Sequence, residues 1–542
     1  MKNNKKYLKS SIIISIILSI IYVICDSINK NYFIDILNFI SVFKLIGYFV
    51  LFFFLINFFF RFLDSGKIIK FKENSFLDSS KKSFIINFFI IFVINLLFLL
   101  RYFPGNLTFD SYTQIKQAIG VLPLSNNHSL FHTLIIKLFT STFSNINVAV
   151  FMYSLFQIII VSLVFSFILR ILARNNVPFV FKFLCLLFYA FHPINIFYSF
   201  TLWKDILFSI TFLLFCLMLN KSDDLFKNKK SLILFIVVTL LMMSFRNNGP
   251  FVVYITFFII LFIKRKSIIK YSILFISIVL IFIITKSITF NIFNIKDASI
   301  SEALSLPSQS IARIYKYKYN ELSKDEIEKI EKFYSDKIGE VYVPYISDNT
   351  KALLKNSYYL EHTKEYYELN LRLLKKFPKE FLESFISNSY GYYYTSYDYS
   401  SIIIGDTDEI GIEHKSLLSM KTISVIMFII LSILFIIFVK NLENKKVIFY
   451  FILLVLLLLL TSKFNIKNNY FVSLFFNIGF YSLITILLFI YNIINKKDIT
   501  YFIPIIILWL MILLSPVFAE FRYLYPLFLM MPIYFCNSLK KA

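Results

Sequence analysis

The first segment that could do chemistry is the polar stretch from Arg101 to Phe131, which lies between two apolar runs. It carries an acid, Asp110, shortly after a Pro-Gly pair, and it leads into His128 and His132, which are four residues apart. This spacing places both histidines on one face if the segment is helical. A carboxylate such as Asp110 can hold a divalent cation that bridges a phosphate, or it can accept a proton from a hydroxyl group. The alternative interpretation is a solvated loop acid with two interfacial histidines.

A second candidate is the segment FYSFTLWKDILF, which places Lys204 and Asp205 between two closely spaced apolar runs. A cation and a carboxylate at this position could bind a polar ligand. A purely structural interpretation is equally good, with Trp203 as an interfacial anchor, Lys204 reaching for the interface and Asp205 capping a helix.

The elements that must position these residues are membrane helices. Of the 542 residues 58% are hydrophobic and 16% are charged, against about 25% charged in a soluble domain, so the composition excludes a soluble globular enzyme. We expect an all-α polytopic membrane protein with about fourteen spans. The expected spans lie near residues 11–25, 39–60, 83–100, 147–169, 183–200, 206–219, 232–245, 250–263, 272–288, 422–439, 447–462, 470–492, 501–516 and 523–536.

The distribution of lysine predicts the orientation of these spans. With the N-terminus inside, every alternate loop is rich in lysine, as the positive-inside rule requires. We therefore interpret the net charge of +24 as a sign of topology and expect the lipid bilayer, not nucleic acid, as the partner. The expected location is the cell membrane, with multiple spans and with both termini in the cytoplasm.

The long stretch 290–421 then lies outside and predicts a mainly helical outer subdomain between membrane modules 1–289 and 422–542. Ser323 and Glu326 have the spacing of a capping box, which predicts a helix toward Gly339. A second helical pattern runs from Ser357 to Lys376, and Pro378 is expected to begin a third helix.

Arginine is unusual in this chain because several arginines fall in the outer loops, where the positive-inside rule does not need them. A guanidinium binds phosphate through two parallel hydrogen bonds, so these arginines favour an anionic ligand on the outer side. The strongest candidates are Arg246, with Asn247, in FRNNGPF and Arg522, with Glu520, in AEFRYLYP. Random surface arginines are the alternative.

The segments FPGNLTFDSYTQ, NNHSLFHT, LWKDILFS, FRNNG, SLPSQSIAR, VPYISDNTK and EFRYLYP together resemble a family of uncharacterised bacterial membrane proteins placed among the GT-C-type glycosyltransferases. The resemblance runs from about residue 83 to residue 530. The wider superfamily includes protein O-mannosyltransferases and lipid A aminoarabinose transferases. It has many spans and a first large outer loop that bears a catalytic acid.

This resemblance implies transfer of a sugar from a polyprenyl-phosphate donor to a cell-envelope glycan, lipid or protein outside the cytoplasm, with inversion. It places Asp110, in loop 101–131, at the catalytic position, as a general base or as a ligand of Mg²⁺ or Mn²⁺. The residues expected to bind the donor phosphate and sugar are His128, His132, Lys204, Asp205, Arg246, Asn247, Arg313, Glu520 and Arg522, with Arg313 closing the site from the outer subdomain. Many members of the superfamily have adjacent acids at the catalytic position, whereas Ser111 follows Asp110 here, so both roles of Asp110 stay open.

Two other functions remain as alternatives. A transporter or flippase of lipid-linked glycans would place ionisable residues near the bilayer midplane, whereas here they gather in outer loops. A glycan polymerase or ligase would use a donor on a lipid diphosphate.

Overall fold

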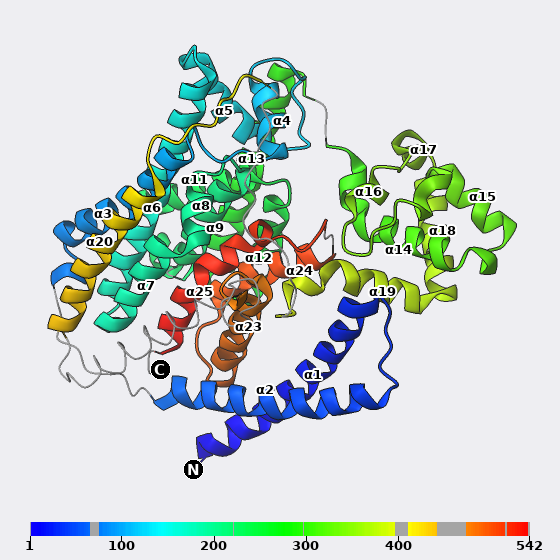
Figure 1. Cartoon of the computed structure of the whole chain (residues 1–542), viewed down its shortest axis with the longest axis horizontal. Coiled ribbons are helices and arrows are strands. Elements are labelled where there is room, and N and C mark those ends of the chain that lie inside the picture. The colour runs from blue at the N-terminus through cyan, green and yellow to red at the C-terminus, as the bar shows by residue number, and fades with distance from the viewer. Residues whose placement is uncertain are drawn as a thin grey trace.

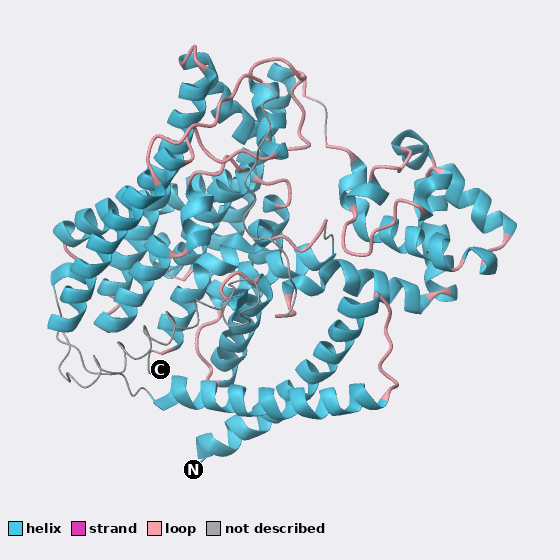
Figure 2. Ribbon diagram, in the orientation of Figure 1, coloured by secondary structure: helices cyan, strands magenta, loops and turns pink. Residues whose placement is uncertain are grey.

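The computed structural model describes residues 2–65, 75–220, 222–295, 298–395, 410–441, 473–514 and 517–539. Every regular element in this part of the chain is a helix, as Figure 2 shows, and β-pairing there is limited to isolated bridges. The predicted all-α class is therefore confirmed for the described residues.

Six helices of the described residues are long and apolar enough to cross a bilayer. They are α1 (Lys2–Asn31), α2 (Phe39–Ser65), α3 (Lys81–Arg101), α6 (Ile146–Arg174), α13 (Ile268–Phe293) and α20 (Met420–Lys440). A seventh span results if α7 (Phe179–Phe191) and α8 (Pro193–Ser199), bent by 49°, cross together. The bend lies at Pro193, which has no N–H to continue the helical hydrogen bonds. The protein is therefore a membrane protein with several spans.

Other apolar segments form helices shorter than the roughly 20 residues that a perpendicular span needs. They are α9 (Lys204–Leu219), α11 (Lys229–Phe245), α12 (Gly249–Ile263), α23 (Ile478–Ile494), α24 (Ile503–Leu514) and α25 (Tyr525–Ser538). The expected span 447–462 lies outside the described residues, as does the start of the span 470–492. The count of about fourteen spans thus stays a prediction.

Helix α9 lies at the centre of the membrane bundle. It is buried on almost all sides because α11 and α25 pack against it, and α6 contacts it as well. Figure 1 shows α3, α6, α7 and α20 on one side of this centre, and the hairpin of α1 and α2 below it. Four of the predicted site residues, Arg246, Asn247, Glu520 and Arg522, follow α11 or precede α25, and two more, Lys204 and Asp205, begin α9 itself.

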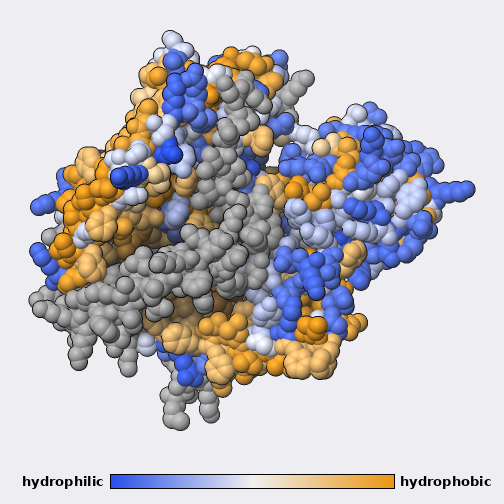
Figure 3. Space-filling view, viewed as in Figure 1, coloured by the Kyte–Doolittle hydropathy of each residue, from blue (hydrophilic) through white to orange (hydrophobic). Residues whose placement is uncertain are grey.

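The predicted outer subdomain has a hydrophobic core of its own, which includes Ile311, Phe333, Tyr366 and Leu373. Its helices are α14 (Ser305–Tyr317), α15 (Lys324–Phe333), α16 (Asp348–Lys351), α17 (Asn356–Glu361), α18 (Thr363–Lys376) and α19 (Pro378–Ser389). It lies to the right in Figure 1, and Figure 3 shows that its surface is largely hydrophilic, whereas orange apolar side chains cover much of the bundle and the hairpin.

Two predicted helix starts of this subdomain are confirmed. The backbone N–H of Glu326 donates to Ser323 Oγ at 3.2 Å, and that of Ser323 donates to the Glu326 carboxylate at 2.8 Å. Helix α19 begins at Pro378. The pattern from Ser357 to Lys376 forms two helices, because the chain breaks at His362 between α17 and α18.

Two further helices, α4 (Phe109–Ala118) and α5 (Leu130–Thr142), come from the predicted outer loop and the residues after it. They pack against each other, and α5 also contacts α6. Figure 1 shows α4 and α5 together at the top of the molecule, above the bundle. They form the support for Asp110. A short helix, α10 (Ser222–Leu225), joins the ends of α9 and α11 at the other side of the bundle.

Candidate functional site

The loop before Asp110 is joined to the loop before Lys204. The backbone N–H of Asn106 donates to the carbonyl of Phe200 at 3.2 Å, and that of Leu202 donates to the carbonyl of Asn106 at 3.0 Å. Asn106 Nδ2 also donates to Thr201 Oγ1 at 2.9 Å. These bonds hold the start of α4 beside the start of α9, so two segments about 95 residues apart meet.

Gly105 allows this loop to lie close to α6. A Cβ atom on Gly105 would lie 2.5 Å from Ser154 Oγ and 3.3 Å from the carbonyl oxygen of Phe200, and the φ angle is +154°. A side chain at this position would push the loop away from α6.

Ser111, which follows Asp110, has a structural role. Its Oγ accepts a hydrogen bond from the backbone N–H of Thr108 at 3.0 Å and donates to the carbonyl of Leu202 at 2.8 Å. Trp203 Nε1 donates to Thr108 Oγ1 at 2.6 Å. The first turn of α4 is thereby fixed to the α9 loop, and the positive end of the helix dipole favours the Asp110 carboxylate.

The charged residues of four chain segments meet around Asp110. Its Oδ2 lies 2.7 Å from Arg522 Nη1 and 3.7 Å from Lys204 Nζ. Arg522 Nε lies 2.5 Å from Glu520 Oε2. Lys204 Nζ lies 3.1 Å from His128 Nδ1. We call this group, with the adjacent pair of Asp205 and Arg246, the charged cluster.

Asp205 and Arg246 form the second ion pair of the charged cluster. Arg246 Nε lies 3.2 Å from Asp205 Oδ1. Arg246 also donates through Nη1 to the backbone carbonyl of Tyr523 at 3.3 Å, which ties the pair to the segment of Arg522. The structural alternative predicted that Asp205 caps the helix. Instead, Trp203 is the N-cap residue of α9, and Asp205 lies in the first turn.

Aromatic rings and the two arginines alternate in one stack. The guanidinium carbon of Arg522 lies 4.8 Å from the ring centroid of Trp203 and 5.0 Å from that of Tyr523. The guanidinium carbon of Arg246 lies 5.1 Å from the ring centroid of the same Tyr523 and 5.4 Å from that of Phe208. Such contacts hold a guanidinium in place without neutralising its charge. Tyr523 and Phe208 were not among the predicted residues, because the pairing arises only when α9 and the segment before α25 come together.

The exposure of the charged cluster is graded. The side chains of Asp110 and Lys204 are 26% and 17% exposed, and that of Arg522 is 10% exposed. The carboxylates of Glu520 and Asp205 are 1% exposed. The Arg246 side chain is 10% exposed, like that of Arg522, so a ligand would meet Asp110 and the three cations before the two buried acids.

The cluster shifts the acidity of its members in different directions. Burial raises the pKa of Asp110, but the charges of Lys204 and Arg522 more than offset this and hold that pKa well below its usual range. Burial raises the pKa of Glu520 to about 7, although Arg522 lowers it in part. Burial and the charge of Lys204 lower the pKa of His128 to about 4. At neutral pH Asp110 is therefore ionised, and His128 is neutral and accepts a hydrogen bond from Lys204.

The structure separates the two histidines that the sequence placed on one helix face. Helix α5 begins at Leu130, because Ser129 Oγ accepts from the backbone N–H of His132 and caps the helix. His128 thus precedes the helix and faces Lys204. His132 is fully buried, with Nδ1 3.0 Å from Gln114 Oε1 and Nε2 2.6 Å from the hydroxyl of Tyr153. His132 therefore connects α4, α5 and α6.

Two other predicted residues lie apart from the charged cluster. Asn247 Nδ2 donates to the carbonyl of Asn126 at 2.8 Å, which joins the turn after α11 to the loop before α5. Arg313 lies in the outer subdomain, 2.5 Å from Glu383 Oε2 and 2.9 Å from the carbonyl oxygen of Tyr32. The structure thus places Arg313 at the junction with the α1–α2 loop, because the buried face of α14 points there.

The residues present do not fit a divalent cation held by protein ligands alone. The part of the chain that the structure describes contains no group of three or more His, Cys, Asp or Glu residues able to hold a metal ion. One oxygen of Asp110 already faces both Arg522 and Lys204. Two cations at this oxygen repel a third, so we derive no step through a metal ion.

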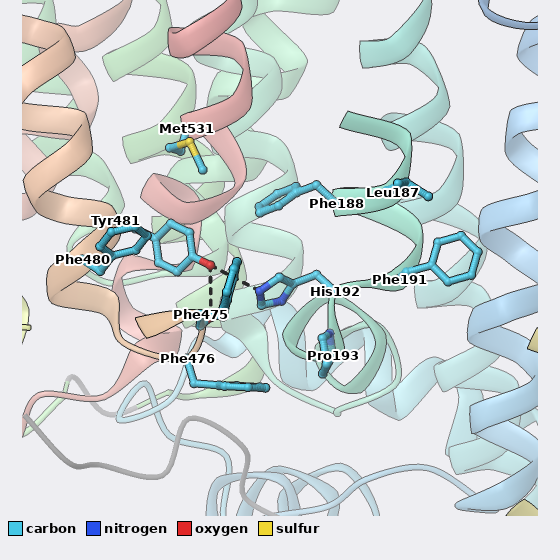
Figure 4. Close-up of a pocket in the computed structure, with 10 residues that line it drawn as sticks. All are labelled: Leu187, Phe188, Phe191, His192, Pro193, Phe475, Phe476, Phe480, Tyr481 and Met531. Carbon is cyan, nitrogen blue, oxygen red and sulfur yellow. Dashed lines mark hydrogen bonds between the residues drawn. The ribbon is translucent and has the colours of Figure 1, made fainter. Parts of the chain in front are cut away.

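An apolar pocket of about 520 Å³ lies between the α7–α8 bend and α23. Figure 4 shows its aromatic lining, with His192 and Tyr481 pointing toward each other, 3.3 Å apart between Nε2 and the hydroxyl. Phe521 lies 6.1 Å from Tyr481 by ring centroids and stands between Glu520 and Arg522 in the chain. Phe521 thus contacts a residue that lines this pocket and is adjacent in the chain to two residues of the charged cluster.

Comparison with known proteins identifies the family of this chain. A family model described as a family of unknown function, DUF6020, matches residues 119–542. The chain belongs to the DUF6020 family. The match includes all the cluster residues except Asp110. No curated protein and no solved structure matches the chain significantly.

Proposed function

We propose that this DUF6020 protein is a membrane glycosyltransferase of the GT-C type. It transfers a sugar from a polyprenyl-phosphate donor to an acceptor of the cell envelope, outside the cytoplasm, with inversion at the anomeric carbon. The observation that carries the proposal is the convergence of Lys204 and Arg522 on Asp110, 3.7 and 2.7 Å away, together with an apolar pocket whose Tyr481 contacts Phe521, the residue between Glu520 and Arg522. A lipid-linked phosphate needs this combination of fixed cations and apolar surface.

The cations bind and stabilise the donor phosphate. When the bond between the sugar and the phosphate breaks, the phosphate gains a negative charge, and prepositioned cations lower the energy of that transition state. Lys204 and Arg522 are the cations that face Asp110, and stacking on Trp203 and Tyr523 keeps Arg522 in place. His128 is neutral, and because its Nδ1 accepts from Lys204, its one N–H lies on Nε2 and can donate to a phosphate or sugar oxygen.

Asp110 accepts the proton of the attacking hydroxyl group. The acceptor oxygen forms a bond to the anomeric carbon, the carbon–phosphate oxygen bond breaks, and the hydroxyl proton moves to Asp110. In the free protein the two cations make Asp110 a weak base. A bound phosphate would draw Lys204 and Arg522 toward itself, which raises the basicity of Asp110 only when the donor is present.

The charge of the cluster favours a donor with a single phosphate. Lys204, Arg246 and Arg522 face the carboxylates of Asp110, Asp205 and Glu520, and the pKa of about 7 leaves Glu520 partly protonated at neutral pH. The net charge is therefore between zero and plus one. This balances the one negative charge of a sugar phosphodiester better than the two of a lipid diphosphate, which the polymerase or ligase alternative would use.

The apolar pocket supports a lipid-linked donor. Its volume of about 520 Å³ lies within the roughly 300–1,000 Å³ range of small-molecule sites. It could accommodate the isoprene units next to the phosphate, with the rest of the chain in the bilayer. The transporter alternative is less favoured, because the cluster lies at the ends of α4, α9 and α11 and not at their middles.

The test is mass spectrometry of envelope glycans from cells that lack this protein and carry either the wild-type gene or a variant. We expect the wild type to restore a missing sugar, and Asp110→Asn, present at equal abundance, to fail. The matched control is Asp325→Asn, which removes an exposed acid of the outer subdomain and should restore the sugar. Full restoration by Asp110→Asn would show that Asp110 is not catalytic.

A second measurement separates the donors. Purified protein is given synthetic sugar donors on a polyprenyl monophosphate or diphosphate, and release of the lipid phosphate is followed. The proposal expects turnover of the monophosphate and loss of that turnover in Asp110→Asn. Turnover of the diphosphate alone would favour the polymerase or ligase alternative.

A further inference from the structure

A second cavity lies at the opposite end of the helices that carry the charged cluster. Helix α9 begins at Lys204 and ends at Leu219, and its 16 residues span about 24 Å at the rise of an α-helix. The C-cap Asn220 lines a cavity of about 340 Å³, together with the ends of α6 and α25 and the first turns of α11. This cavity is therefore remote from the charged cluster.

The cavity is apolar inside and polar at its rim. Leu172, Leu217 and Val238 are among the side chains that line its interior. Phe167 and Leu234 also line it, and they are 40% and 55% exposed on the protein surface. In a membrane protein this exposed apolar surface faces lipid, so a hydrocarbon chain can enter from the side.

The rim offers groups for both a negative and a positive charge. Arg174 and Asn175 lie at the end of α6, and their side chains provide N–H donors for a phosphate. Asp224 lies at the same rim, with its carboxylate 2.8 Å from Lys227 Nζ. Helices α6 and α9 also end here, and the carbonyl groups at helix C-terminal ends favour a cation, whereas the end of α25 already holds Lys497, whose Nζ donates to the Ser538 carbonyl at 2.7 Å.

We propose that this cavity binds one phospholipid whose headgroup carries a primary ammonium. One acyl chain fills the apolar interior, the phosphate contacts Arg174 and Asn175, and the ammonium donates hydrogen bonds to Asp224 and to the carbonyl groups at the helix ends. A purely anionic headgroup would lack a partner for the helix ends, and a quaternary ammonium has no N–H to donate. The bound lipid would join α6, α9, α11 and α25, three of which continue to the charged cluster.

The experiment is native mass spectrometry of the delipidated full-length protein in detergent. Phosphatidylethanolamine, phosphatidylcholine and phosphatidylglycerol with identical acyl chains are added in turn. We expect phosphatidylethanolamine to bind about tenfold more tightly than the other two, the equivalent of one charge-assisted hydrogen bond. Equal binding of the three lipids, or preference for phosphatidylglycerol, would overturn the proposal.

Variants connect the binding to the cavity. Asp224→Asn should reduce the preference for phosphatidylethanolamine over phosphatidylcholine, and Arg174→Gln should weaken both. Val238→Phe fills the interior and should weaken all three lipids. Arg265→Gln, in the turn between α12 and α13, is the matched control and should change nothing. Unchanged binding in the first three variants, each checked for an unaltered melting temperature, would refute the assignment.

Discussion

Replacement of Arg522 by methionine tests how the charged cluster is held together. The Arg522 side chain is 10% exposed, lies 2.7 Å from Asp110 Oδ2 and 2.5 Å from Glu520 Oε2, and stacks on Trp203. Methionine has a similar length and no charge. The variant therefore leaves the carboxylates of Asp110 and Glu520 without the cation that they share, and the Glu520 carboxylate is buried.

The structure limits the magnitude of this effect. Removal of one partner of a buried ion pair costs about 3–5 kcal/mol, because the other charge is left buried. Glu520 can avoid this cost by binding a proton, since burial has already raised its pKa to about 7 and loss of Arg522 raises that pKa further. We therefore expect a loss of about 3 kcal/mol at pH 8 and a smaller loss at pH 6, since one pH unit corresponds to about 1.4 kcal/mol.

The direction of the pH dependence follows from the same pKa. The pKa of Glu520 in the folded protein, about 7, lies above its ordinary value of 4.5. Between these values the folded protein holds a proton that the unfolded chain has released, so stability falls as the pH rises from about 4.5 to 7. In Arg522→Met this fall should continue above pH 7, where the stability of the wild type levels off. Glu520→Gln should remove this dependence in both backgrounds.

The assay is thermal unfolding in detergent, followed by tryptophan fluorescence between pH 5 and 9. Trp203, one of two tryptophans in the chain, stacks on Arg522 and reports on the site. Arg372→Met is the matched control, because Arg372 pairs with Asp325 at the surface, where both side chains are about half exposed, and such pairs contribute about 0–1 kcal/mol. If Arg522→Met unfolds like Arg372→Met at every pH, or if Glu520→Gln leaves its pH dependence intact, the reasoning is wrong.

Three other substitutions have defined outcomes. Gly105→Ala should lower the melting temperature, because its Cβ would lie 2.5 Å from Ser154 Oγ, and Ser154→Gly should restore part of the loss. His132→Phe should destabilise the protein by about 2–3 kcal/mol through two lost buried hydrogen bonds, and a variant as stable as the wild type would contradict the role we assign. Arg313→Met should cost about 3 kcal/mol, because the buried Glu383 then keeps only Lys379 Nζ at 3.7 Å and the backbone N–H of Ile34 at 2.7 Å as partners. Addition of Glu383→Leu should recover part of that stability, while sugar transfer per folded molecule stays unchanged, and loss of transfer in a stable double variant would place Arg313 in the site.

The sequence by itself determined what depends on short-range patterns. Apolar runs identified the membrane class, because the bilayer requires a minimum length of apolar helix. The spacing of Ser323 and Glu326 and the position of Pro378 determined two helix starts, because capping depends on residues within one turn. The placement of arginines in the predicted outer loops singled out Arg246 and Arg522, since the positive-inside rule does not require positive charge there.

The tertiary structure alone decided which of these residues meet. Asp110 and Arg522 are 412 residues apart in the chain, and no local pattern predicts that they pair. The same holds for Tyr523, which lies between two arginines, and for Arg313, whose partner Glu383 keeps it in the outer subdomain. The histidine spacing failed because Ser129 starts α5 between His128 and His132. Periodicity places side chains on a helix, but packing between distant segments determines which faces come into contact.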